Sequence, residues 1–145
     1  MKKICDPEEA AGSAENGEKP LNLRFTVLDG SFAVCRLKSA AEADLRAVPF
    51  VSLTATGEEV SFVCPEAAMP ANRTAAETGW RCLKLLGPLD FSLTGVLAEI
   101  SAALARRKIS IFAVSTFDTD YILVKKERVP EAVEVLKECG CTYIE

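Results

Sequence analysis

The stretch of sequence that decides the fold lies in the second half of the chain, where residues 80–86 read WRCLKLL and residues 92–107 read SLTGVLAEISAALARR. The first stretch is an apolar run ended by the turn residues Gly87-Pro88, a pattern typical of a strand. In the second stretch the apolar side chains fall on one face at helical spacing, at Leu93, Val96, Leu97, Ile100 and Leu104. A strand followed by an amphipathic helix is therefore the first predicted unit.

Further elements follow this unit along the chain. The patterns predict two strands, a helix and a final strand, at residues 109–116, 121–125, 128–138 and 141–144. Pro130 is tolerated in the first turn of a helix, and Gly140 is suited to ending it. The order strand, helix, strand, strand, helix, strand predicts an α+β, ferredoxin-like βαββαβ fold with an antiparallel sheet over residues 79–145.

The first half of the chain predicts a different organisation. Residues 1–19 contain little to bury and are expected to form a flexible tail. Residues 20–78 are expected to form a β-rich unit containing two hairpins, the first turning at Asp29-Gly30 and the second at residues 57–59. A short helix over 39–46 and a partly helical crossover over 65–76 complete this unit.

Composition restricts the class of protein. The chain has 145 residues, is 49% hydrophobic and carries a net charge of −4. These values are typical of a globular protein and argue against nucleic acid or an anionic membrane as a partner. Because no apolar run has the length of a membrane span and residues 1–6 lack an apolar signal core, the sequence predicts a cytoplasmic protein.

Cysteine and histidine usage restricts the chemistry further. The chain has six cysteines at irregular spacings and no histidine. The absence of a Cys-x-x-Cys motif predicts no metal site, and we expect the thiols to be packed and reduced. Without histidine, Ser-His and Cys-His catalysis is excluded. No phosphate-binding loop, dinucleotide fingerprint or nucleophile elbow is present. We therefore expect no enzyme activity and no cofactor.

The loop between the first predicted strand and helix carries unusual chemistry. An α-amino acid needs an acceptor for its ammonium group and donors for its carboxylate. Asp90 can accept, and free N–H groups near Thr94, Gly95 and Val96 can donate. The alternative is that Asp90 and the hydroxyl side chains of this loop only cap the helix. Spacing alone leaves both interpretations open.

A second polar cluster follows the strand at residues 109–116. Ser115 and Thr116 end this strand, and Asp118 and Asp120 lie in the turn after it. These side chains either contact a ligand or, in the case of Asp118 and Thr119, bond their own backbone to shape the turn. We expect both polar clusters to meet at one edge of the sheet if two domains pack side by side.

The two strings GPLDFSLTGVLA (87–98) and ISIFAVSTFDTDYILV (109–124) together resemble the ACT domain family, in particular the subgroup of aspartate kinase regulatory regions and small stand-alone ACT-like proteins. The resemblance implies two tandem units, the first divergent, whose sheets pack side by side around a small ligand. Carried over by position, the residues that would contact the ligand are Asp90, Ser92, Thr94, Gly95, Val96, Leu97, Ile111, Phe112, Ser115, Asp118 and Asp120.

One position departs from the family pattern. Arg107-Lys108 stands before Ile109, where the family usually has a glycine in the turn that ends the helix. Because this turn favours a left-handed backbone, we expect Lys108 to adopt that conformation.

Three functions compete at this point. The first is a regulatory module that binds an amino acid at an ACT–ACT interface and signals to a regulated protein partner, with a homodimer expected because small sheets leave unpaired edges. The second is a structural or assembly module without a ligand. The third, an enzyme of unrecognised type, is the least favoured.

Overall fold

A computed structural model describes residues 20–87, 89 and 94–145 of the chain, so the predicted tail at 1–19 and the candidate residues Asp90 and Ser92 lie outside the described residues. Neither α-helix in the described part is long and apolar enough to span a membrane. The elements are β1 (Arg24–Val27), β2 (Phe32–Leu37), η1 (Ala40–Glu42), β3 (Ser52–Ala55), β4 (Val60–Pro65), η2 (Glu66–Ala68), β5 (Ala75–Leu86), α2 (Val96–Arg106), β6 (Ile111–Ser115), β7 (Asp120–Lys125), η3 (Lys126–Arg128), α3 (Val129–Glu138) and β8 (Thr142–Tyr143).

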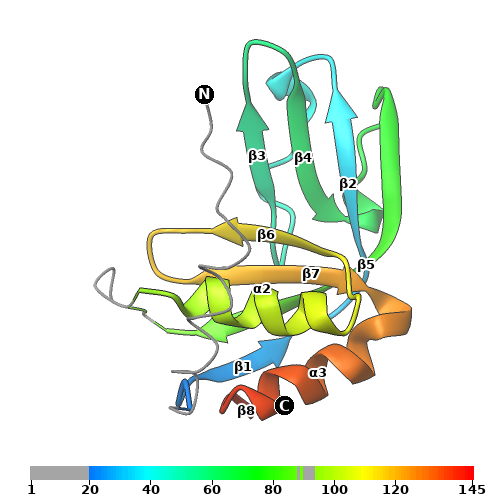
Figure 1. The fold of residues 1–145 in the computed structure, drawn as a ribbon. Coiled ribbons are helices and arrows are strands. Elements are labelled where there is room, and N and C mark those ends of the chain that lie inside the picture. Colours follow the sequence, from blue (N-terminus) through cyan, green and yellow to red (C-terminus); the bar gives the residue numbers. More distant parts are fainter. Residues whose placement is uncertain (1–19, 88, 90–93) are drawn as a thin grey trace.

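The second half has the predicted βαββαβ order, from β5 through α2, β6, β7 and α3 to β8. β7 pairs antiparallel with both β5 and β6. Figure 1 shows α2 and α3 on one side of these strands. Leu83 and Leu85 of β5 pack under Ile100 of α2 and Leu136 of α3, and all four are fully buried. The α+β ferredoxin-like fold is therefore confirmed.

One strand of this sheet comes from the first half of the chain. β1 pairs antiparallel with β5 and parallel with β8, so the strand order is β8-β1-β5-β7-β6. The hydrogen bond from Thr142 N to Leu23 O, at 2.8 Å, continues the pairing of β8 beyond β1. We call this sheet with α2 and α3 the helical lobe. The expected division between residues 78 and 79 falls within β5. Hydrogen bonds between β1 and the C-terminal half of β5 connect the two expected units.

The hairpin predicted at Asp29-Gly30 is wrong. β1 and β2 do not pair with each other, and both pair antiparallel with the same edge of β5: Val27 lies opposite Leu83, and Phe32 opposite Trp80. Four residues, 28–31, separate Val27 from Phe32, whereas only two residues of β5, 81 and 82, separate their partners. Gly30, within the longer segment, has φ +84°. An Asp-Gly pair indicates a positive φ but not a chain reversal, and here the glycine serves a bulge.

The hairpin predicted around residues 57–59 is confirmed. β3 pairs antiparallel with β4, and Thr56 N donates to Glu59 O at 2.9 Å in its turn. β4 pairs with β2, and β2 with the N-terminal half of β5, which gives the order β3-β4-β2-β5. We call these strands, together with the segments that connect β2, β3 and β4, the strand lobe. Its predicted helix over 39–46 is reduced to η1, and the crossover contains only η2.

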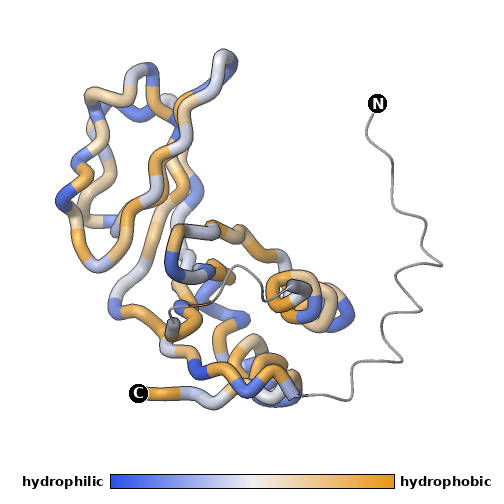
Figure 2. The backbone as a smooth tube through the Cα atoms, turned by 90° about the vertical axis from the view of Figure 1, so that its left-hand side faces the viewer, coloured by the Kyte–Doolittle hydropathy of each residue, from blue (hydrophilic) through white to orange (hydrophobic). Residues whose placement is uncertain are grey.

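Gly79 marks the point where β5 passes from one lobe to the other. It has φ +80°, which suits glycine, and its N–H donates to Glu66 Oε1 at 2.7 Å. Figure 1 shows β2, β3 and β4 rising away from β6 and β7, and Figure 2 shows the same arrangement from the side. β5 is therefore a shared strand, and its bend sets the angle between the two lobes.

A second cluster of buried side chains fills this angle. Phe32 and Phe50 of the strand lobe pack against Trp80, Cys82 and Leu123 on the sheet face opposite the helices. The helical lobe thus has α2 and α3 on its front face and part of the strand lobe on its back face.

The described cysteines, all but Cys5, are free. Burial raises the pKa of both Cys64 and Cys82 to about 12, which keeps these thiols protonated near neutral pH. This agrees with packed, reduced thiols.

Candidate functional site

The loop after β5 is attached directly to the β6–β7 turn. Leu89 N donates to the main-chain oxygen of Asp118 at 2.7 Å. A Cβ at Gly87 would lie 2.6 Å from Leu89 N and 3.1 Å from Asp118 O, so only glycine leaves room for this close approach. The described part of this loop therefore contacts the β6–β7 turn within a single chain.

The β6–β7 turn is shaped by its threonines. Thr116 N donates to Thr119 O at 2.8 Å, and Thr116 Oγ1 accepts from Thr119 N at 3.3 Å. The Thr119 hydroxyl, which is buried, donates to Leu85 O at 2.7 Å and fixes the turn to β5. The Asp118 side chain takes no part in these bonds, so of the two alternatives for Asp118 the turn-forming one is wrong. Thr116 has that role.

The helix that borders this turn begins later than the sequence predicts. Gly95 is the N-cap residue of α2, with φ +82°, and its carbonyl accepts the Glu99 N–H at 2.9 Å. An α-helix leaves the N–H groups of its first turn without partners within the helix. At α2 these belong to Val96, Leu97 and Ala98. Glycine adopts the left-handed backbone at low cost, which explains a helix start directly after Gly95.

These elements enclose an open cleft of ≈ 260 Å³, which we call the α2 cleft. It brings together six of the predicted site residues: Gly95, Val96, Leu97, Ser115, Asp118 and Asp120. Five further residues line it that were not among the predicted ligand contacts, although Thr116, Phe117 and Thr119 belong to the second polar segment: Leu89, Ala98, Thr116, Phe117 and Thr119. Of these, Thr116 and Thr119 carry a recognisable signal, since a Thr-x-x-Thr spacing suits a hydrogen-bonded turn.

Three predicted residues do not line this cleft. Thr94 is exposed just before the helix. Ile111 lies at the other end of β6 from Ser115 and packs into the core beneath the helices. Phe112 points to the opposite sheet face, where it packs against the cluster between the lobes. Because side chains alternate along a strand, Ile111 and Phe112 cannot both face the same site.

Polar groups in the cleft are arranged in two sets. The helix N-terminus presents N–H groups and a partial positive charge. Across from it, Asp118 and Asp120 present carboxylates that have no hydrogen bond or ion pair among the residues described. The described residues contain no group of three or more potential His, Cys, Asp or Glu metal ligands. The arrangement therefore suits a ligand that carries both an acceptor and a cationic group.

Comparison with known proteins agrees with this geometry. Residues 75–138 match the family model described as the ACT domain. Residues 75–138 belong to the ACT domain family. The match runs from the start of β5 to the end of α3, and it includes all lining residues of the α2 cleft.

Relatives of this ACT domain protein differ in length. The human "Cytosolic arginine sensor for mTORC1 subunit 1" is 26% identical over 132 residues, which cover 90% of this chain and 33% of that protein. The chain thus spans a third of that relative. The structure of Agrobacterium tumefaciens protein Atu0741 is 33% identical, with TM-score 0.73, over 85% of this chain and 92% of that one. The aspartate kinase regulatory subunit from Thermus thermophilus, 12% identical with TM-score 0.61 over 83% of this chain and 99% of that one, shares the fold.

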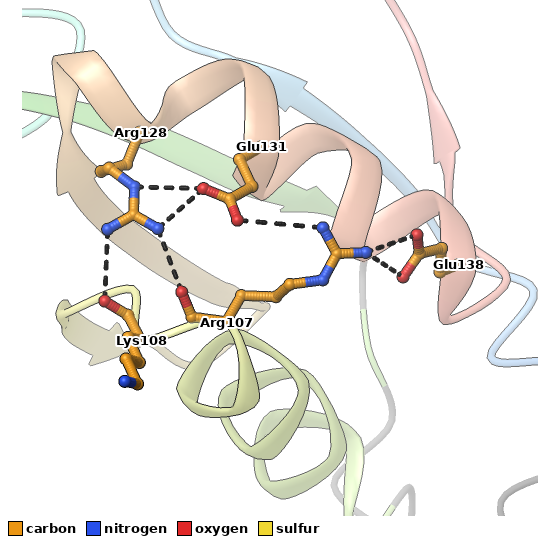
Figure 3. A network of polar contacts seen from close by, with 5 residues as sticks. All are labelled: Arg107, Lys108, Arg128, Glu131 and Glu138. Atoms are coloured by element: carbon orange, nitrogen blue, oxygen red, sulfur yellow. Dashed lines mark hydrogen bonds and ion pairs between the residues drawn. The ribbon is translucent and has the colours of Figure 1, made fainter.

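The far end of α2 is fixed by an arginine of the ACT domain. Arg128 donates from Nη2 to Arg107 O at 3.0 Å and from Nη1 to Lys108 O at 3.2 Å (Figure 3). Lys108 has φ +56°, as the departure from the family pattern predicts. A guanidinium on the last carbonyl groups complements the negative end of the helix. Arg128 therefore stabilises a turn in which the family usually has glycine.

The same network joins α2 to α3. Arg107 Nη2 donates to both carboxylate oxygens of Glu138, at 2.7 and 3.0 Å, and Glu131 Oε2 accepts from Arg128 at 2.7 Å (Figure 3). Each of these exposed pairs contributes little alone. Together with the main-chain contacts of Arg128, they set the position of α2, whose other end borders the α2 cleft.

Proposed function

We propose that this protein is a regulatory module that binds an amino acid in the α2 cleft. One observation carries the proposal: two kinds of polar group line the same cleft. One is the pair of carboxylates that lack partners in the described structure, and the other is the set of N–H groups at a helix N-terminus. The ammonium group of an amino acid would contact Asp118 or Asp120. Its carboxylate would accept from the N–H groups of Val96, Leu97 or Ala98.

Two features favour a basic amino acid. The α2 cleft contains two carboxylates, one more than a single α-ammonium group needs. The human relative is named an arginine sensor, which makes arginine the first ligand to test. An arginine guanidinium pairs with a carboxylate through two parallel hydrogen bonds.

The α2 cleft is open to solvent in the single chain, and we propose that a second ACT unit closes it. β6 borders the α2 cleft through Ser115 and pairs with only one strand, β7, among the described strands. Unpaired strand edges favour pairing with a second copy. A homodimer joined at β6 would place the ligand at an ACT–ACT interface, where binding can change assembly and so signal to a protein partner.

The test is thermal unfolding of the full chain with each of the twenty L-amino acids, arginine first. A ligand at a hundred times its Kd stabilises the folded state by about 2.7 kcal/mol, which raises the Tm by several degrees. Asp120→Asn should remove this shift. Glu58→Gln removes an equal charge from the exposed β3–β4 turn and should leave the shift intact.

Size-exclusion chromatography with light scattering, with and without the ligand, tests the assembly step. A ligand-dependent change of mass supports the ACT–ACT interface. If no amino acid shifts the Tm of a well-folded sample, the proposal is wrong and the structural or assembly function takes its place.

A further inference from the structure

A second pocket lies on the other side of the β6–β7 turn from the α2 cleft. It has a volume of ≈ 270 Å³, and we call it the back pocket; it is lined by Lys84, Gly87, Thr116, Asp118, Thr119 and Tyr121. Lys84 and Tyr121 are directly opposite in the pairing of β5 with β7. Because Leu83 and Leu85 face the helices, Lys84 between them faces the back of the sheet. The back pocket thus shares Thr116, Asp118 and Thr119 with the α2 cleft but opens on the other face of the sheet, where Lys84 and Tyr121 line it.

Lys84 brings a positive charge without a counter-ion into this pocket. Its ammonium group lies 5.8 Å from the centre of the Tyr121 ring. Within the described residues, no carboxylate oxygen lies within 4.0 Å of it, and it donates no hydrogen bond. Lysine is seldom even half-buried without such a partner. Its three N–H donors are therefore available to an anionic group.

The rest of the pocket adds one donor, two acceptors and one negative charge. The Tyr121 hydroxyl makes no hydrogen bond to the described residues, so it can donate. The protons of Thr116 and Thr119 are already donated, to Thr119 O and Leu85 O, so both hydroxyls can only accept. Asp118 supplies a carboxylate that does not pair with Lys84. A cation and an anion therefore line one pocket without contacting each other.

Packing holds this arrangement in place. The Tyr121 ring stacks on Phe50 at 4.4 Å between centroids, and Phe50 in turn packs edge-on against Phe32. Phe50 and Phe32 belong to the strand lobe. The ring of Tyr121 is consequently fixed from a separate part of the fold, and Thr119 fixes the opposite wall through its bond to β5. A pocket with rigid walls loses little freedom when it binds a ligand.

We propose that the back pocket is a second binding site for a zwitterionic α-amino acid. Its carboxylate accepts hydrogen bonds from the Lys84 ammonium group and the Tyr121 hydroxyl. Its ammonium group faces Asp118. A ligand with separated opposite charges matches a pocket with separated opposite charges, whereas a simple anion would be repelled by Asp118. Asp118 lines both this pocket and the α2 cleft, whereas Lys84 and Tyr121 line only this pocket, so these two residues distinguish the two sites.

The experiment uses calorimetric titration of the full chain with the twenty L-amino acids. For each amino acid that binds, Lys84→Met should weaken one binding event at least tenfold, and Lys84→Arg should restore most of it. Tyr121→Phe, which keeps the ring stacking, should weaken the same event several-fold. Lys137→Met is the matched control, since it removes an exposed lysine from α3 without touching either pocket.

Two analogues of the binding amino acid test the zwitterion requirement. The amide, which lacks the carboxylate charge, and the acid without its amino group should each lose the binding event that depends on Lys84. Backbone amide NMR locates the site: shifts at Lys84, Gly87 and Tyr121 indicate the back pocket, and shifts at Gly95 and Val96 indicate the α2 cleft.

The outcomes separate this inference from the proposed function. If binding depends on Asp120 but not on Lys84, the back-pocket inference is overturned and the α2 cleft stands. If it depends on Lys84 but not on Asp120, the back pocket is supported and the α2 cleft proposal fails. If no amino acid binds, or binding depends on neither Asp120 nor Lys84, both the α2-cleft proposal and the back-pocket inference are overturned.

Discussion

The two lobes share β5 but bury their sheets by different means. In the helical lobe α2 and α3 cover the front face, and the largest buried cluster lies beneath them. The strand lobe has no α-helix among its described residues. One face packs on a small cluster that includes Phe62, Cys35 and Cys64, and the other face packs on the back of the helical lobe. The strand lobe therefore depends on the helical lobe for part of its core.

That dependence predicts a single unfolding transition. Phe62 is fully buried in the strand lobe, and Phe62→Ala should destabilise the whole chain by about 3 to 5 kcal/mol. Urea unfolding should be followed by circular dichroism at 222 nm, which reports α2 and α3, and by fluorescence of Trp80, the only tryptophan, which lies between the lobes. Both midpoints should fall together. If the signal at 222 nm of Phe62→Ala unfolds at the same urea concentration as that of the unsubstituted chain, the two lobes unfold independently and the prediction is wrong.

A second test compares two glycines, one in each lobe. Gly140 ends α3 with φ +91°, and a Cβ there would lie 2.7 Å from Pro20 Cα and 2.8 Å from Leu21 N. Gly140→Ala should therefore cost about 2 to 4 kcal/mol through backbone strain and overpacking. Gly57, in the β3–β4 turn, has no atom within 4 Å of an added Cβ. Gly57→Ala is the control and should change stability by less than about 0.5 kcal/mol.

The contrast between the lobes also shows what the sequence can reveal. The helical lobe is predictable because each of its elements carries a local signal: helical periodicity in α2, Pro130 at the start of α3, Gly140 at its end. The strand lobe depends on long-range pairing. The bulge at Gly30 and the bend at Gly79 arise because one long strand accepts two partners, which no local pattern in residues 24–37 indicates.

The same reasoning explains how far the candidate site could be predicted. The lining residues contributed by α2 and the β6–β7 turn follow from two loops that carry polar residues beside regular elements. Lys84 was missed because a single lysine in an apolar strand has no distinguishing spacing. Ile111 was placed in the site by resemblance, and only the register of β6 shows that it faces the core.

Two buried thiols should make stability depend on pH: Cys64 in the strand lobe and Cys82 on the shared strand β5. Burial raises the pKa of Cys64 and of Cys82 from 9.0 to about 12. Below pH 9 each thiol is protonated in both states, so stability is unaffected. Between pH 9 and 12 the unfolded chain loses the proton first, and stability falls by about 1.4 kcal/mol per pH unit for each thiol.

Cys82→Ala and Cys64→Ala test this assignment separately. Each variant loses core packing at every pH, but each should also show a shallower fall in the free energy of unfolding between pH 9 and 11. Urea unfolding at several pH values in that range provides the measurement. An unchanged slope in either variant would show that its thiol is not the group that titrates.

The smallest expected effect concerns the connection between α2 and α3. Arg128→Ala removes two hydrogen bonds to the carbonyl groups that end α2 and should cost about 1 to 2 kcal/mol. Glu127→Ala is a neighbouring control, since Glu127 makes no ion pair or hydrogen bond among the described side chains. Adding Lys108→Gly to Arg128→Ala relieves the left-handed residue at φ +56° and should recover part of the loss. Equal stability of the single and double variants would show that Arg128 does not act through this turn.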